Sequence, residues 1–229
     1  MHFNFYISQN DEKAKIVGIF QMDDPYGISA RAKQYHISEE LAKEIHENKS
    51  DEWNNKLDNI LSKTYKDNAG KLKNSLKFFN DYWLKNDAYF FDKIEKVLNE
   101  NVEQYNVLLS HFVAGTSDWV GNNICTNAYS NEWSGENSHV YYLLYETILS
   151  HIFKRIRKIN KVLKDLKVWS ISELTAFTIL HNEFDLFESE SKTNYDEIDN
   201  KREQVKEIYL KCKNMNDFLN IIIKNSKNE

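Results

Sequence analysis

The C-terminal half of this chain is organised around residues 138–153, Ser-His-Val-Tyr-Tyr-Leu-Leu-Tyr-Glu-Thr-Ile-Leu-Ser-His-Ile-Phe. Apolar side chains recur there at intervals of three or four residues, through Tyr141, Tyr145, Ile148 and Ile152. This period predicts an amphipathic helix with one buried face. The pattern continues beyond the run, so we predict one long helix over residues 137–167.

Two strands are predicted before this helix and another helix after it. Residues 105–113, Tyr-Asn-Val-Leu-Leu-Ser-His-Phe-Val, read as a largely buried strand, and residues 123–129 as its neighbour. Ser170 and Glu173 have the spacing of a capping box, which predicts a helix that begins there and continues through Phe184. The order is therefore strand, strand, helix, helix.

The N-terminal half has a different pattern. Residues 3–7 and 16–20 are rich in β-forming side chains and predict a hairpin, and amphipathic helices follow to about residue 101. One proline and six glycines leave few helix breakers in 229 residues. We predict an α+β fold that is predominantly α-helical, with an N-terminal β-hairpin, a helical half, a short central sheet and long C-terminal helices. The predicted domains are residues 1–103 and 104–229, which could form one continuous domain.

Composition excludes several classes of protein. The two cysteines, Cys125 and Cys212, make neither a disulfide framework nor a Cys-x-x-Cys metal knuckle. The N-terminus has no basic segment of an export signal, and no apolar run reaches the roughly 18 residues of a membrane span. We therefore expect a cytoplasmic protein with no membrane partner. The abundance of lysine, asparagine and isoleucine suggests a bacterial or phage gene.

The order of strands and helices in residues 105–185 resembles the core of zincin metallopeptidases of the gluzincin type. In that family a helix after an edge strand carries His-Glu-x-x-His, and a later helix supplies a glutamate ligand to zinc. Tyr145-Glu-Thr-Ile-Leu149 stands where His-Glu-x-x-His would be. The resemblance implies that Glu146 matches the general base and that Glu173, in Trp-Ser-Ile-Ser-Glu-Leu-Thr-Ala, matches the glutamate ligand. Both histidine positions differ, because they hold Tyr145 and Leu149.

This departure decides the expected chemistry. Two histidines four residues apart place both imidazoles on one helical face toward zinc, and a single carboxylate cannot replace them. We therefore expect a zincin-like domain without catalytic zinc and without a cofactor. It would act as a protein-binding or scaffold module that meets another protein through an aromatic-rich groove.

Other readings of the same residues stay open. An active metal-dependent hydrolase would use Glu146 as base and bind zinc through His139, Glu173 and His181, because His139 shares the helical face of Glu146. Against this, Glu173 is also explained as a capping-box residue and Glu146 as a solvated helix residue. His151 reads as a histidine at the edge of the core.

A third reading concerns the charges of the same region. The chain carries a net charge of −5, which argues against a general nucleic-acid binder. A basic patch on the long helix could nevertheless bind a phosphate backbone, or pair with the acidic stretch at residues 183–203. The members of this basic patch are Lys154, Arg155, Arg157, Lys158, Lys161 and Lys164.

Overall fold

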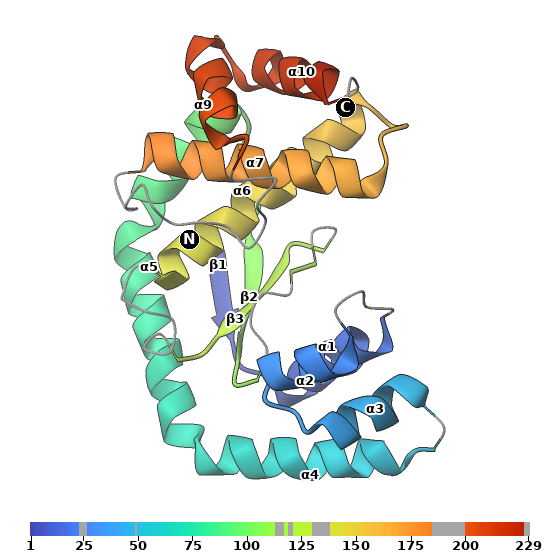
Figure 1. Cartoon of the computed structure of the whole chain (residues 1–229). Helices are drawn as coiled ribbons and strands as arrows, with labels where there is room; N and C mark the ends of the chain where they lie inside the picture. Colours follow the sequence, from blue (N-terminus) through green and yellow to red (C-terminus); the bar gives the residue numbers. More distant parts are fainter. Residues whose placement is uncertain are drawn as a thin grey trace. The chain divides into compact units, whose positions relative to one another are not determined.

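The computed structural model describes residues 1–22, 27–48, 50–112, 117–118, 121–129, 138–184 and 200–226. Within these residues the chain is mainly helical with a small parallel sheet, which confirms the predicted α+β, predominantly helical class (Figure 1). The chain forms two compact units. Unit 1 combines Phe3–Lys85 with Gln104–Gly135, and unit 2 combines Asn86–Glu103 with Glu136–Glu229. Every helix in the described part is too short or too polar to span a bilayer.

Unit 1 is built on three strands, β1 (Phe3–Tyr6), β2 (Tyr105–Ser110) and β3 (Asn123–Asn127), in the order β1-β2-β3. Both pairs are parallel, with Phe3 opposite Tyr105 and Asn106 opposite Asn123. Five of the six residues of the central strand are buried, as parallel sheets require. The two strands predicted before the long helix are confirmed, and together with β1 they form the short central sheet.

The predicted N-terminal hairpin is wrong. β1 pairs with β2, and the chain after it forms helix α1 (Gln9–Gln21). Ser8 caps this helix, since its hydroxyl accepts a hydrogen bond from the Asp11 amide at 3.2 Å. Ile16, Ile19 and Phe20 then fall on one buried helical face. A short apolar run is compatible with either structure, and here the cap and the tertiary contacts favour the helix.

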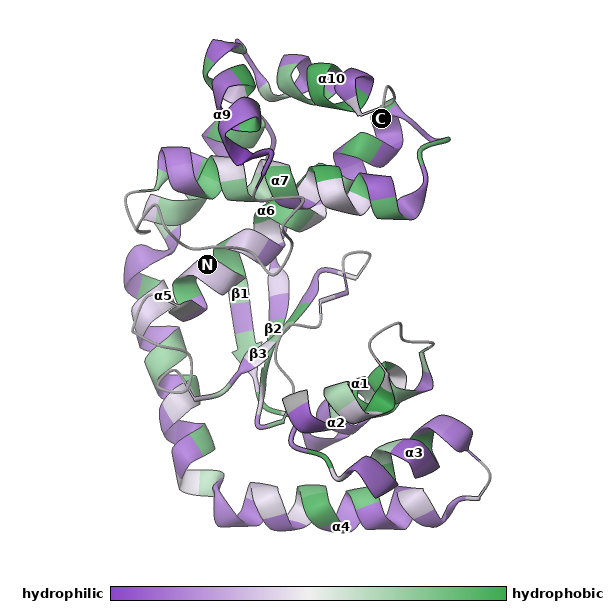
Figure 2. Cartoon of the chain, viewed as in Figure 1, coloured by the Kyte–Doolittle hydropathy of each residue, from purple (hydrophilic) through white to green (hydrophobic). Residues whose placement is uncertain are grey.

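Helix α1 packs against one face of the sheet. The next helices are α2 (Ile28–Gln34), α3 (Glu39–Glu47) and α4 (Glu52–Asp67); α3 and α4 pack on α1, and α2 packs on α3. Along α4, hydrophobic and hydrophilic residues alternate as expected for a helix with one buried face (Figure 2). The resulting core includes Leu108 and Cys125 from the sheet together with Leu57 and Leu61 from α4.

The other side of the strands carries aromatic packing from α5 (Ala69–Leu98), whose first part belongs to unit 1. Phe3 meets Trp83 edge-on at 4.6 Å between ring centroids, and Phe5 lies 5.2 Å from Phe79. All four rings are buried. The high aromatic content of the chain thus contributes to this core.

A buried carboxylate joins α1 to the sheet. Glu12 is fully buried and accepts hydrogen bonds from the Ser110 hydroxyl, from the Phe112 amide at 2.7 Å and from the Tyr65 hydroxyl at 2.5 Å. Burial and the Glu12 charge raise the pKa of Tyr65, so its phenol stays a donor. These three donors compensate for the desolvation of the carboxylate.

Unit 2 contains α6 (Ser138–Ile159), α7 (Asp165–Glu183), α9 (Arg202–Lys211) and α10 (Met215–Asn225). The long helix ends eight residues earlier than predicted, at Ile159, and α7 begins after an N-cap at Lys164. The predicted capping box is therefore wrong, because Ser170 and Glu173 lie inside α7.

Candidate functional site

The two carboxylates singled out by the sequence both lie buried in unit 2. Glu146 comes from α6 and is 7% exposed, and Glu173 comes from α7 and is 6% exposed. The two helices pack against each other over much of their length. Glu146 is therefore not a solvated helix residue. Burying two acids in one helical pair is costly, so their environment requires a physical account.

Tyr145 affects the ionisation of one of these two carboxylates, Glu173. Its hydroxyl lies near the Glu173 carboxylate and lowers the pKa of that acid. Burial raises the pKa of Glu173 to about 7, the Tyr145 hydroxyl opposes the rise, and the nearby Glu146 charge adds to it. Burial and the two carboxylates also raise the pKa of Tyr145 above its ordinary value. The phenol therefore keeps its proton, and Glu173 keeps its proton to a higher pH than an ordinary glutamate does.

One oxygen of Glu173 has no compensating contact. Its Oε2 atom is buried and has no hydrogen-bond partner among the described residues. An unpaired carboxylate oxygen is tolerated more easily when the group is neutral, because the penalty for burying the charge then disappears. This agrees with the raised pKa. The geometry is that of a buried proton-binding carboxylate.

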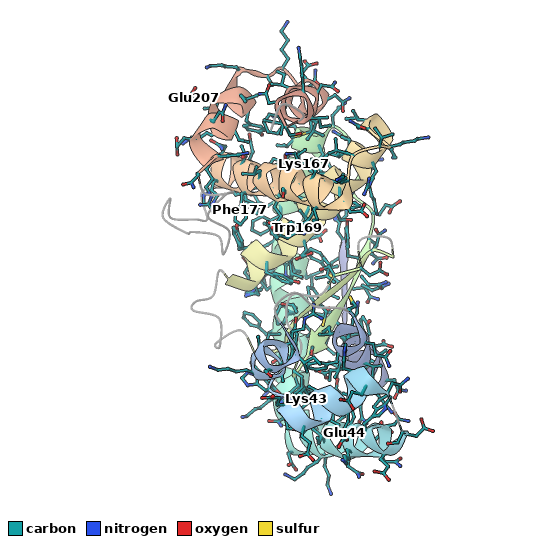
Figure 3. All side chains as sticks on the ribbon, turned by 45° about the vertical axis from the view of Figure 1, so that its right-hand side comes forward. Lys43, Glu44, Lys167, Trp169, Phe177 and Glu207 are labelled. Carbon is teal, nitrogen blue, oxygen red and sulfur yellow. The ribbon has the colours of Figure 1, made fainter. Side chains whose placement is uncertain are left out.

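Aromatic rings lie beside this carboxylate. We call Tyr141, Tyr145 and Phe177 the aromatic cluster; each is half-buried. Tyr141 and Tyr145 stack with ring centroids 6.0 Å apart, and the Phe177 ring lies 5.1 Å from that of Tyr145. The Arg202 guanidinium of α9 sits 4.8 Å from the Phe177 centroid, within cation–π range. Figure 3 shows Phe177 on α7.

The positions that the resemblance assigns to imidazoles hold a tyrosine and a leucine. Tyr145 lies beside Glu173, and Leu149 is buried in the core with 2% of its surface exposed. Within the described residues there is no group of three or more histidine, cysteine, aspartate or glutamate side chains that could hold a metal ion. The site thus pairs two carboxylates and a phenol, which can bind and release a proton.

The two histidines predicted as ligands lie toward the same end of this helical pair, where the rings of Tyr141 and His181 are 6.1 and 6.3 Å from that of Phe177. His139 is in the first turn of α6, where burial lowers its pKa to about 4. His181 is in the last turn of α7, where burial and the charges of Arg202 and Lys206 lower its pKa. Its ring stacks on Phe177 at 6.3 Å. Both imidazoles are therefore neutral at pH 7.

The predicted basic patch is divided between paired and exposed side chains. Arg155 binds Glu100 at 2.5 Å and donates to the Leu98 carbonyl at 2.7 Å. Arg157 pairs with Asp165 and donates to the Leu163 carbonyl. The exposed members, at the end of α6 and in the connection to α7, are Lys158, Lys161 and Lys164. Of the acidic stretch that might pair with the patch, residues 185–199 lie outside the described residues.

No sequence motif indicated Glu100, yet its carboxylate binds Arg155 of the basic patch. It also binds His151 Nδ1 at 2.6 Å, and that histidine is buried at the edge of the core, as expected. Burial opposes the ionisation of Glu100, but the bonds from His151 and Arg155 outweigh it and lower its pKa to about 2. A neighbouring cavity of about 230 Å³ is lined by these three residues and by Lys154.

Comparisons with protein-family models, with curated proteins and with solved structures gave no match. The sequence did not indicate that Tyr145 would lie beside Glu173 or that Arg202 would lie against Phe177. The available signal for the first of these contacts was the tyrosine at the first histidine position, directly beside Glu146.

Proposed function

We propose that this chain is a non-catalytic zincin-like domain that serves as a protein-binding or scaffold module. The observation that carries the proposal is the contact between the Tyr145 hydroxyl and the Glu173 carboxylate. In the metallopeptidase arrangement that the sequence resembles, the residue at position 145 and the glutamate at position 173 would both bind zinc. Here the Tyr145 hydroxyl, which keeps its proton, lies beside the Glu173 carboxylate.

The chemistry of this contact opposes metal binding. A zinc ligand must present a deprotonated oxygen or an unprotonated nitrogen. Tyr145 keeps its proton because its pKa is raised, and Glu173 has a pKa of about 7. Leu149 offers no ligand atom. The contact between the Tyr145 hydroxyl and Glu173 therefore joins α6 to α7 in place of a metal ion.

The surface beside this contact supports a protein partner. Each ring of the aromatic cluster is half-buried, and Arg202 lies against Phe177. Tyrosine, phenylalanine and arginine are enriched at protein–protein interfaces, where they give large contact areas at a small entropic cost. We therefore place the partner at the aromatic cluster and Arg202.

Metal content tests the non-catalytic part of the proposal. The protein is purified without chelator, and zinc is measured by mass spectrometry for the wild type, Glu173→Ala and the exposed control Glu207→Ala. We expect no stoichiometric zinc in any of them and no cleavage of unfolded casein after zinc is added. Stoichiometric zinc that disappears only in Glu173→Ala would identify an active metal-dependent hydrolase instead.

Partner binding is tested at the aromatic cluster. A protein captured from a cell extract is purified, and its dissociation constant is measured against the wild type, Phe177→Ala and the control Leu210→Ala. Leu210 is 65% exposed on α9. We expect Phe177→Ala to weaken binding by at least about tenfold, as interface hot spots do. Equal affinities for both variants would place the partner elsewhere.

The exposed lysines motivate one alternative function, nucleic-acid binding. Lys158, Lys161 and Lys164 are exposed, whereas both arginines of the basic patch are already paired within unit 2. Charge-driven binding to duplex DNA must weaken steeply between 50 and 200 mM salt and must weaken further in Lys161→Glu/Lys164→Glu. Affinity with both properties would favour this alternative over a protein partner.

A further inference from the structure

A second, separate site lies between α7, α9 and α10 of unit 2. These helices enclose a pocket of about 520 Å³. Small-molecule sites in proteins typically occupy about 300–1,000 Å³, so the pocket is large enough for a ligand of that class. It contains none of the residues of the carboxylate pair or the aromatic cluster.

The floor of the pocket is aliphatic. Four of its side chains are less than 9% exposed and belong to the packing between the three helices. An apolar ligand placed on these side chains would be removed from water, which favours binding. The entropic cost of ordering the side chains would be small, because packing between the helices already fixes them. The floor residues are Ile171, Leu174, Val205, Ile208 and Ile222.

The rim is polar, and much of it is uncommitted. Lys167, Ser170, Gln204 and Asn225 line the pocket, and their side chains make no hydrogen bond or ion pair with any described residue. Other hydroxyls of α7 behave differently; that of Ser172, for example, donates to the carbonyl four residues earlier. Lys167 stands in the first turn of α7 (Figure 3). The rim therefore offers donors to a ligand.

The charged residues that the structure describes in the pocket lining are basic. They are Lys167 and Lys201, and no described acidic residue lines the pocket. Lys201 is also the N-cap of α9, an end that has no side-chain cap and where the helix dipole adds positive potential. Glu203 lies in the first turn of α9 but does not line the pocket. An anionic group is favoured at this rim.

We propose that this pocket binds a small amphipathic anion. Its carboxylate lies at Lys167 and Lys201, and its aliphatic body lies on the floor between Ile171, Leu174 and Val205. A phosphate head group on the same aliphatic body shares this chemistry. The inference is independent of the proposed protein-binding function, because the two sites share no residue.

Calorimetric titration of the full chain tests the proposal. The probes are decanoate, decyl phosphate and the uncharged decanol, each below the concentration at which it forms micelles. The variants are Lys167→Glu/Lys201→Glu at the rim and Ile208→Trp in the floor. Lys211→Glu is the matched control, because Lys211 is exposed on α9 and lies outside the pocket. Thermal unfolding of each variant verifies that it is folded.

We expect one molecule of decanoate per chain, bound more tightly than decanol. The rim double variant should weaken binding by about tenfold or more, from the loss of two favourable charge interactions. Ile208→Trp should weaken both anions, and Lys211→Glu should leave them unchanged. Preference for decyl phosphate would identify the phosphate as the head group.

Three results overturn the inference. Equal affinity for decanol and decanoate means that the rim selects no anion. Equal weakening by Lys211→Glu and the rim variant means that only the net charge matters. The absence of saturable binding to the folded wild type means that the pocket takes no ligand of this class. None of these outcomes bears on the metal content or on the partner tested above.

Discussion

Glu173 makes the stability of unit 2 dependent on pH. Burial raises its pKa from the ordinary 4.5 to about 7, a rise of about 2.5 units. Because the folded state favours the protonated acid, this contribution is fully present below pH 4.5 and is lost as the pH rises through about 7. At 1.36 kcal/mol per unit, the loss amounts to about 3 kcal/mol of unfolding free energy.

Glu173→Gln isolates this contribution. Glutamine has nearly the same shape, stays neutral at every pH and has an oxygen that can accept a hydrogen bond from a hydroxyl such as that of Tyr145. We expect the unfolding free energy of the variant, relative to the wild type, to increase by about 3 kcal/mol between pH 4.5 and pH 8.5. Urea unfolding, followed by circular dichroism at several pH values, measures this difference. Glu207→Gln, on the exposed surface of α9, is the control.

A difference between Glu173→Gln and the wild type that stays constant from pH 4.5 to pH 8.5 would refute the reasoning. It would mean that Glu173 does not titrate in this window and that its environment is more polar than the helical pair suggests. The carbon chemical shift of the Glu173 carboxyl group gives a second, direct reading of the pKa. That reading does not depend on whether the two units unfold together.

Three further changes test other parts of the structure. Glu12→Ala should lower the unfolding free energy by about 3 kcal/mol or more, because it leaves three donors of unit 1 unpaired; a loss below about 1 kcal/mol in urea unfolding would contradict this role. Glu100 has a pKa lowered to about 2, so it stabilises the fold above pH 4.5 and this stability is lost as the pH falls toward 2. Glu100→Gln should therefore flatten the acid side of the stability profile measured by circular dichroism, and an unchanged profile would count against the ion pairs. Leu149→Ala should cost about 2–5 kcal/mol as a buried core truncation, and Val162→Ser, at a site 87% exposed, less than about 0.5 kcal/mol; similar melting temperatures for the two variants would contradict the assigned burial.

Local patterns predicted much of the secondary structure. The strands at residues 105–110 and 123–127 follow from apolar runs bounded by polar segments, and the dominance of helices follows from the scarcity of proline and glycine. The N-terminal hairpin failed because residues 16–20 suit either a strand or one face of a helix. The partner of β1 is β2, about one hundred residues away, and no local pattern identifies such a partner.

The sequence by itself determined which chemical groups are available. It placed Tyr145 and Leu149 where two imidazoles would be needed, and it placed Glu146 and Glu173 on helices. Only the tertiary structure decided what these groups do. Helix packing brings α7 against α6, buries both carboxylates and brings the Tyr145 hydroxyl to Glu173. The physical reason is that a pKa depends on burial and on neighbouring charges, and both arise from contacts between residues far apart in the chain.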